Sequence, residues 1–168
     1  MCRRGGIVSL VFAMTLVLSL GTAWGRLIES WPYGKLFKTA ELVIIAKAES
    51  VRDAPEADKV SLPVEHRNIM TGVVTRFRVI YVVKGEHKDQ RLDLVHFKMR
   101  GDWKIANGPL LVKFVLRKPD APELDHSSPD YLLFLKKGKD GRFECVSGQY
   151  DPALSVKLVS SDPVSLSK

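Results

Sequence analysis

The stretch Thr75-Arg76-Phe77-Arg78-Val79-Ile80-Tyr81-Val82-Val83-Lys84 carries the clearest pattern in the chain. Apolar side chains recur at every second position on one face, at Phe77, Val79, Tyr81 and Val83. The opposite face holds Arg76, Arg78, Ile80, Val82 and Lys84. Alternation with a period of two is typical of a β-strand, because successive side chains point to opposite faces. This stretch therefore predicts a strand with one core face and one partly solvated face.

Further strands are expected on both sides of this stretch. Residues 91–98 alternate again after a short loop that contains Gly85, which predicts an antiparallel hairpin. Apolar runs rich in strand-forming residues occupy residues 42–48, 110–116, 131–135 and 142–146. The nearly continuous apolar run at 42–48 indicates burial on both faces. Asp140-Gly141 separates the last two runs and is a favoured hairpin turn.

Little helix is expected. Residues 30–39 leave room for one helical turn, and Asp151-Pro152 predicts a short helix that runs to about Leu158. The Pro-containing segments 52–68, 100–109 and 118–130 are expected to be loops. Five or six strands joined by short turns indicate a mainly β fold, either a small closed barrel or a sandwich.

The first twenty-five residues have the layout of an export signal. Arg3 and Arg4 precede an apolar run at residues 7–20, and Ala23-Trp24-Gly25 offers small residues at a cleavage site. The alternative is an uncleaved membrane anchor, because the uncharged stretch at residues 5–25 is just long enough to cross a bilayer, which needs about 20 apolar residues. We expect a signal peptide at 1–25, one domain at 26–159, a polar tail at 160–168, and a secreted or periplasmic location. No stable membrane insertion is expected after cleavage.

Composition limits the chemistry of the mature chain. Cleavage leaves roughly 140 residues, the size of one domain with an adequate core. The net charge is +7 for the full chain and +5 without residues 1–25 (24 basic minus 19 acidic side chains), and its basic residues are scattered among acidic ones, which favours a solvated surface and leaves a polyanion partner as an alternative. Cys145 would be the sole cysteine, so no internal disulfide can form, and its place in an apolar strand predicts a buried thiol.

The order of the segments resembles the netrin-like superfamily, which includes the tissue inhibitors of metalloproteinases. The resemblance covers roughly residues 27–159 and rests on five segments. These are residues 40–48, 75–85, 131–135, 140–143 and 147–150. The resemblance implies a five-stranded OB-like barrel with a short flanking helix. The inhibitors begin with Cys-x-Cys, which binds the protease zinc, whereas this mature chain would begin Arg26-Leu27-Ile28.

Two groups of residues are candidates for ligand binding. Arg76, Arg78 and Lys84 project from one predicted strand, and an OB barrel commonly binds ligands on a strand face and its loops. The second group lies in the loop after that hairpin and contains Arg100, Trp103 and Lys104. A Trp flanked by basic residues can stack on a base or sugar, or it can cap the barrel end. Arg100-Gly101-Asp102 also spells an integrin-type tripeptide.

No catalytic or metal-binding motif is apparent. His66, His87, His96 and His126 are scattered, without the spacing of a zinc site, and His96 is expected to be a half-buried strand residue. We therefore expect neither a cofactor nor a metal. The favoured function is a non-catalytic binding module whose partner is another extracytoplasmic protein. The alternatives are a protease-inhibitor-like regulator, a polyanion-binding barrel, and a hydrolase assembled by folding.

Overall fold

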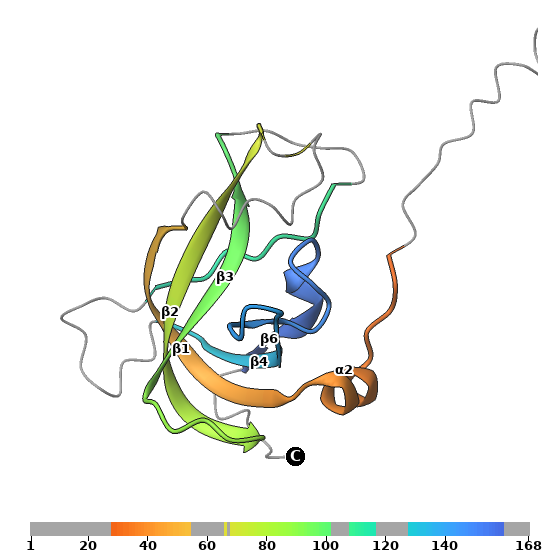
Figure 1. Cartoon of the computed structure of the whole chain (residues 1–168), viewed down its shortest axis with the longest axis vertical. Coiled ribbons are helices and arrows are strands. Elements are labelled where there is room, and N and C mark those ends of the chain that lie inside the picture. The colour runs from red at the N-terminus through yellow and green to blue at the C-terminus, as the bar shows by residue number, and fades with distance from the viewer. Residues whose placement is uncertain (1–27, 55–65, 67, 102–107, 117–127, 160–168) are drawn as a thin grey trace, which may run out of the picture.

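The computed structural model describes residues 28–54, 66, 68–101, 108–116 and 128–159. The expected signal peptide, the C-terminal tail, Trp103, Lys104 and Asp102 of the integrin-type tripeptide lie outside these residues. The described part is mainly β, as the sequence predicts (Figure 1). Its elements are the helix α2 (Tyr33–Thr39), the strands β1 (Leu42–Asp53), β2 (Met70–Lys84), β3 (Arg91–Met99), β4 (Asp130–Lys137) and β5 (Phe143–Cys145), the 3-10 helix η3 (Pro152–Ser155) and the strand β6 (Val156–Val159).

The strands form one antiparallel sheet that curls into a nearly closed barrel. Its order is β3-β2-β1-β4-β5, and the short strand β6 pairs with β4 beside β5. Because β3 and β5 lie close together, the two ends of this path meet. Closure of a twisted sheet removes most of its exposed edges. The expected five-stranded barrel with a short helix is therefore confirmed.

Strand β1 is covered on both faces, as its apolar run predicts. One face enters the barrel core, where Ile44 packs in the same cluster as Phe77, Leu94 and Leu133. The other face packs under α2, where Val43 joins a second cluster with Leu36, Ala40, Phe134 and Val146. Helix α2 thus closes the outside of the barrel along the N-terminal half of β1.

Lys47 is the charged exception within β1. Its side chain is buried, and its ammonium group lies 2.7 Å from the carbonyl oxygen of Ser128 and 2.9 Å from Asp130 Oδ1. A buried charge needs such partners, because the cost of removing it from water is otherwise large. The ion pair fixes the start of β4 against β1.

The core face of β2 differs from the sequence prediction. Phe77 and Val79 face the core as expected, but Tyr81 is exposed and Val82 packs against the core in its place. The β1–β2 register shifts between Ile45 and Ala46, which skips one residue of β2. A β-bulge of this kind reverses the alternation beyond it. Tyr81 and Val83 therefore point away from the core.

Three further expectations need correction. Residues 108–116 are extended but belong to no strand. The helix expected from Asp151 to about Leu158 is only the single turn η3, followed by β6. Asp151 makes no cap hydrogen bond to that turn, and its Oδ1 atom instead accepts one from the Leu110 backbone amide at 2.9 Å. His96 is buried rather than half-buried.

The end of β2 is tied to helix α2. Lys84 donates hydrogen bonds from Nζ to the carbonyl oxygens of Phe37 at 2.7 Å and Ala40 at 2.5 Å, which satisfies groups that the helix leaves unpaired. Gly85 follows with a φ of 82°, and a Cβ there would lie 2.2 Å from the Glu41 carbonyl oxygen. Only glycine fits this close approach. Within the described residues, no helix has the length and apolar character needed to cross a membrane.

Candidate ligand-binding site

One end of the barrel encloses a cavity of about 560 Å³ between β2, β3 and residues 108–116. We call it the mouth cavity. Most of its walls are apolar, and they include Val51, Val73, Leu111, Val112, Phe114 and Leu116. Its polar side chains are Thr75, His96, Lys98 and Lys113. Small-molecule sites have volumes of roughly 300–1,000 Å³ and a similar mixture of apolar walls and a few polar groups.

The strand register explains why these residues share one wall. Val51 pairs with Thr75 across β1 and β2, and Val73 pairs with His96 across β2 and β3. Directly opposed residues in an antiparallel pair lie on the same face of the sheet. Phe77 lies two residues beyond Thr75 on that face and is fully buried in the core. The mouth cavity is therefore the barrel interior continued past the last core layer.

The opposite wall is residues 108–116, which are held from three sides. A backbone hydrogen bond joins Leu110 to η3, since the Ala153 amide donates to the Leu110 carbonyl oxygen at 3.1 Å. The Val115 amide donates to the Tyr131 hydroxyl at 2.8 Å. Phe114 inserts into the core with its ring edge-on to Phe77, at a centroid distance of 4.8 Å. These anchors give the cavity a fixed wall without a strand ladder.

His96 and Thr75 form a buried polar pair within the cavity wall. His96 Nε2 lies 2.7 Å from Thr75 Oγ1, and both side chains are almost completely buried. The pKa of His96 is lowered to about 4, mainly by burial; an interaction with the Phe97 backbone acts against this shift, and the positive charge of Lys98 adds to it. The imidazole is therefore neutral at pH 7. Its Nδ1 atom is buried and has no hydrogen-bond partner among the described residues.

Two lysines give the cavity a positive edge. Lys98 lies on β3 with its ammonium group 3.5 Å from Asp53 Oδ1, and about half of its side chain is exposed. Lys113 is exposed on the opposite wall. Exposed lysines flanking an apolar cavity favour a ligand with an anionic end, because the field of the two charges adds at the opening.

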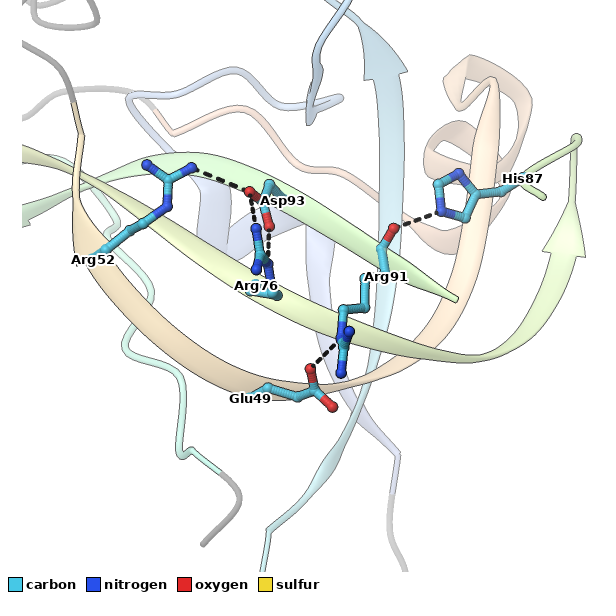
Figure 2. Close-up of polar contacts among 6 residues, drawn as sticks. All are labelled: Glu49, Arg52, Arg76, His87, Arg91 and Asp93. Atoms are coloured by element: carbon cyan, nitrogen blue, oxygen red, sulfur yellow. Dashed lines mark hydrogen bonds and ion pairs between the residues drawn. The ribbon is translucent and has the colours of Figure 1, made fainter. Parts of the chain in front are cut away.

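The first group of sequence candidates does not form one cluster. Arg76 is exposed on the outer face of β2 and pairs with Asp93, which accepts hydrogen bonds from Nε at 2.8 Å and from a terminal guanidinium nitrogen at 3.1 Å (Figure 2). Arg52 also reaches Asp93, at 3.2 Å. The hydrogen bond from Arg76 is the main reason that the pKa of Asp93 is lowered. The pKa of Arg76 is raised by the same contact.

The remaining candidate residues either make contacts within the fold or lie outside the described residues. Arg78 is half-buried and interacts with other groups. Lys84 holds the end of α2 and is eight residues from Arg76, or roughly 26 Å along an extended strand. Arg100 is exposed, and its backbone amide donates to the Ile69 carbonyl oxygen at 2.8 Å. The outer face near Arg76 carries alternating charges, since Arg91 also pairs with Glu49 at 3.1 Å (Figure 2).

The described residues contain no group of three His, Cys, Asp or Glu side chains that could hold a metal ion. Cys145 is buried, as the sequence predicts, and burial raises the pKa of its thiol to about 12. The thiol is therefore protonated at neutral pH and is a poor nucleophile. His66 stacks on Tyr150, with its Nδ1 atom 3.2 Å from the Tyr150 hydroxyl.

Sequence reasoning placed His96 in a strand but expected it to be half-buried, and it missed the cavity. The available signal was that the large apolar residues of that face stop at Thr75, just before Phe77, and at His96, just after Leu94. The contribution of residues 108–116 could not be inferred from alternation, because that segment pairs with no strand.

Comparisons with protein-family models, curated proteins and solved structures give no match for this chain. The netrin-like resemblance accordingly stays a prediction.

Proposed function

We propose that this protein is an exported, non-catalytic binding module that takes a small amphipathic ligand into the mouth cavity. The observation that carries the proposal is an apolar cavity of about 560 Å³ with one buried polar pair inside and two lysines at its edge. An apolar ligand body would cover the walls formed by Val73, Val112 and Phe114. An acidic end would lie near Lys98 and Lys113.

The polar groups of the cavity support binding rather than catalysis. A hydroxyl hydrogen-bonded to an imidazole resembles the first two members of a nucleophile–base–acid triad. Here Thr75 is fully buried, and no described carboxylate orients His96 through Nδ1. The low pKa of His96 also makes it a weak base at neutral pH. Its Nδ1 atom instead offers a hydrogen-bonding position that the described residues leave unfilled.

The expected partner protein and the polyanion alternative stay predictions beside this proposal. A ligand in the cavity would be compatible with either, because Arg76 and the other outer-face charges lie on the opposite side of the sheet from Thr75 and His96. The proposal itself concerns only the cavity.

A matched pair of substitutions tests the cavity. Val51 and Val83 are strand valines with 40% and 42% of their surface exposed, but only Val51 lines the mouth cavity. We expect the apolar anion anilinonaphthalene sulfonate to bind with one-to-one stoichiometry and increased fluorescence. Val51→Trp should fill the opening and weaken binding by about tenfold or more, which corresponds to about 1.4 kcal/mol. Val83→Trp should leave the affinity unchanged.

Thermal unfolding of both variants is the control for folding, since each adds bulk at a partly exposed position. Binding by Val51→Trp at the wild-type affinity would overturn the proposal. Loss of binding in Val83→Trp alone would also overturn it, because the probe would then occupy a different groove.

A further inference from the structure

A second apolar hollow lies on the outside of the barrel beside α2. It has a volume of about 440 Å³ and is open along the exposed rings of Tyr33 and Phe37. Val83 of β2 and the β4 residues Leu132 and Phe134 form its floor. Tyr33 and Phe37 are 60% and 44% exposed, which is unusual for aromatic side chains that line one continuous apolar surface.

Lysines surround these aromatic rings. Lys84 Nζ lies 5.2 Å from the centroid of the Phe37 ring, and Lys157 Nζ lies 5.9 Å from that of Tyr33. Lys38 lines the hollow itself. We define the α2 face as Tyr33, Phe37, Lys38, Val83, Lys84 and Lys157. Two acidic residues flank α2 in the sequence: Glu29 is paired with Lys35, and Glu41 is exposed just after the helix.

The charges of the α2 face decide between possible occupants. A second copy of the chain would bring the same lysines together across a two-fold axis, and like charges in such an interface are unfavourable. An anionic partner avoids this repulsion. Exposed aromatic rings interleaved with lysines are typical of the boundary between lipid headgroups and acyl chains, where apolar ring surface is buried and ammonium groups reach phosphate.

The position of the α2 face in the chain supports a membrane as that partner. The apolar run at residues 7–20 ends thirteen residues before Tyr33, the first residue of α2, a span of at most about 47 Å of extended backbone. While that run is attached, α2 can lie no further than this from it. After cleavage near Arg26, the new amino terminus and Arg26 add positive charge just before the same helix.

We propose that the α2 face binds the surface of a membrane that contains anionic lipids, independently of ligand binding in the mouth cavity. The rings of Tyr33 and Phe37 enter the headgroup layer, Lys38 and Lys157 contact lipid phosphates, and Lys84, which holds the end of α2, adds its positive charge. Peripheral membrane binding of this kind needs both the apolar rings and the lysines, because a small apolar surface or a few charges alone bind weakly.

The test is co-sedimentation of the exported protein with lipid vesicles. Its amino terminus is first determined by sequencing. One vesicle preparation contains phosphatidylcholine alone, and the other also contains phosphatidylglycerol. We expect binding only to the anionic vesicles, weakened but not abolished by added salt. Phe37→Ser and Lys38→Glu should each reduce the partition coefficient by about tenfold.

Matched controls come from the opposite end of the barrel. Val115→Ser removes an exposed apolar side chain and Lys113→Glu reverses an exposed charge, and neither residue belongs to the α2 face. Both should bind anionic vesicles within about twofold of wild type. Equal losses in the controls, or unchanged binding by Phe37→Ser and Lys38→Glu, would overturn the proposal. Concentration-dependent dimerisation that Val83→Trp abolishes, without vesicle binding, would assign the α2 face to a second copy instead.

Discussion

The mouth cavity and the α2 face are both largely apolar, but they differ in where their polar and charged groups lie. In the cavity wall, the polar groups of Thr75 and His96 are buried, neutral and paired with each other. On the α2 face, lysine ammonium groups stand beside exposed rings. The difference follows from depth, since a buried charge must be paired or neutral and an exposed one need not be. A cavity with a neutral interior and lysines only at its edge suits a small ligand, and an open cationic face suits an extended anionic surface.

The two regions also differ in their connection to the core. The α2 face lies outside the sheet, whereas the cavity wall is continuous with the barrel interior. Phe114 marks this continuity, because its ring contacts Phe77, His96 and Tyr131 edge-on. Substitutions around the cavity should therefore cost more stability than those on the α2 face.

The largest expected effect is the loss of the Phe114 ring. Phe114→Ala should lower the free energy of unfolding by about 3–5 kcal/mol, because it leaves a void among three aromatic rings. Urea denaturation gives this difference, and Phe114→Leu is the milder variant if the first does not fold. The neighbouring Val115→Ala, at an exposed position, should change stability by no more than about 0.5 kcal/mol. Similar stability losses for Phe114→Ala and Val115→Ala would contradict the claim that Phe114 is part of the core while Val115 lies on the surface.

The next effect is a pH dependence that originates in the mouth cavity. Unfolded His96 takes up a proton near pH 6.5, whereas folded His96 does so near pH 4, so the unfolded state binds more protons between these values. Acidification through this window should remove up to about 3 kcal/mol of stability. The lowered pKa of Asp93 contributes only at still lower pH.

Urea titrations at several pH values measure this loss. His96→Asn should flatten the curve between pH 6.5 and 4, because it removes the buried imidazole. A wild-type curve that is already flat in that window would mean that His96 is not held neutral by burial.

A smaller effect is expected from the partner of His96. Thr75→Val keeps the shape of the side chain but leaves His96 Nε2 without its hydrogen bond, which should cost about 1–3 kcal/mol. Thr71→Val is the matched change on the same strand, at a half-buried position, and it should cost less than Thr75→Val. A larger cost at Thr71 would show that the buried pair adds nothing to stability.

The smallest effect belongs to the outer face of the sheet. Arg76→Ala removes an exposed ion pair with Asp93 and should lower stability only slightly, with the difference shrinking at high salt. The pKa of Asp93, followed by carboxylate NMR, should rise toward its ordinary value. An unchanged pKa would contradict the contact drawn in Figure 2.

The strands could be predicted because their pattern is local. Alternation at Phe77 and Val79, the β-branched run of β1 and the Asp140-Gly141 turn each report on a few neighbouring residues. The exposure of Tyr81 could not be predicted, because the bulge that reverses its direction depends on the partner strand β1. The β6 strand was missed for a similar reason. Asp151 and Pro152 look like a helix start, but pairing with β4 extends the chain from Val156.

The candidate site was even harder to predict from local sequence patterns. Arg76, Arg78 and Lys84 could be placed on one strand from sequence, yet their partners Asp93, Phe37 and Ala40 come from other elements. The mouth cavity depends on Phe114 and Asp151 fixing residues 108–116 against the barrel end. Such contacts join residues distant in the chain, and no local pattern encodes them.

The separation of the two regions can be tested most directly by one NMR titration. Isotopically labelled protein is titrated with anilinonaphthalene sulfonate, and the backbone amide shifts are followed residue by residue. The account predicts that the perturbed amides gather around Val73, His96 and Phe114, while those of Tyr33 and Phe37 stay unchanged. Perturbations centred on Tyr33 and Phe37, with the mouth cavity unaffected, would contradict it.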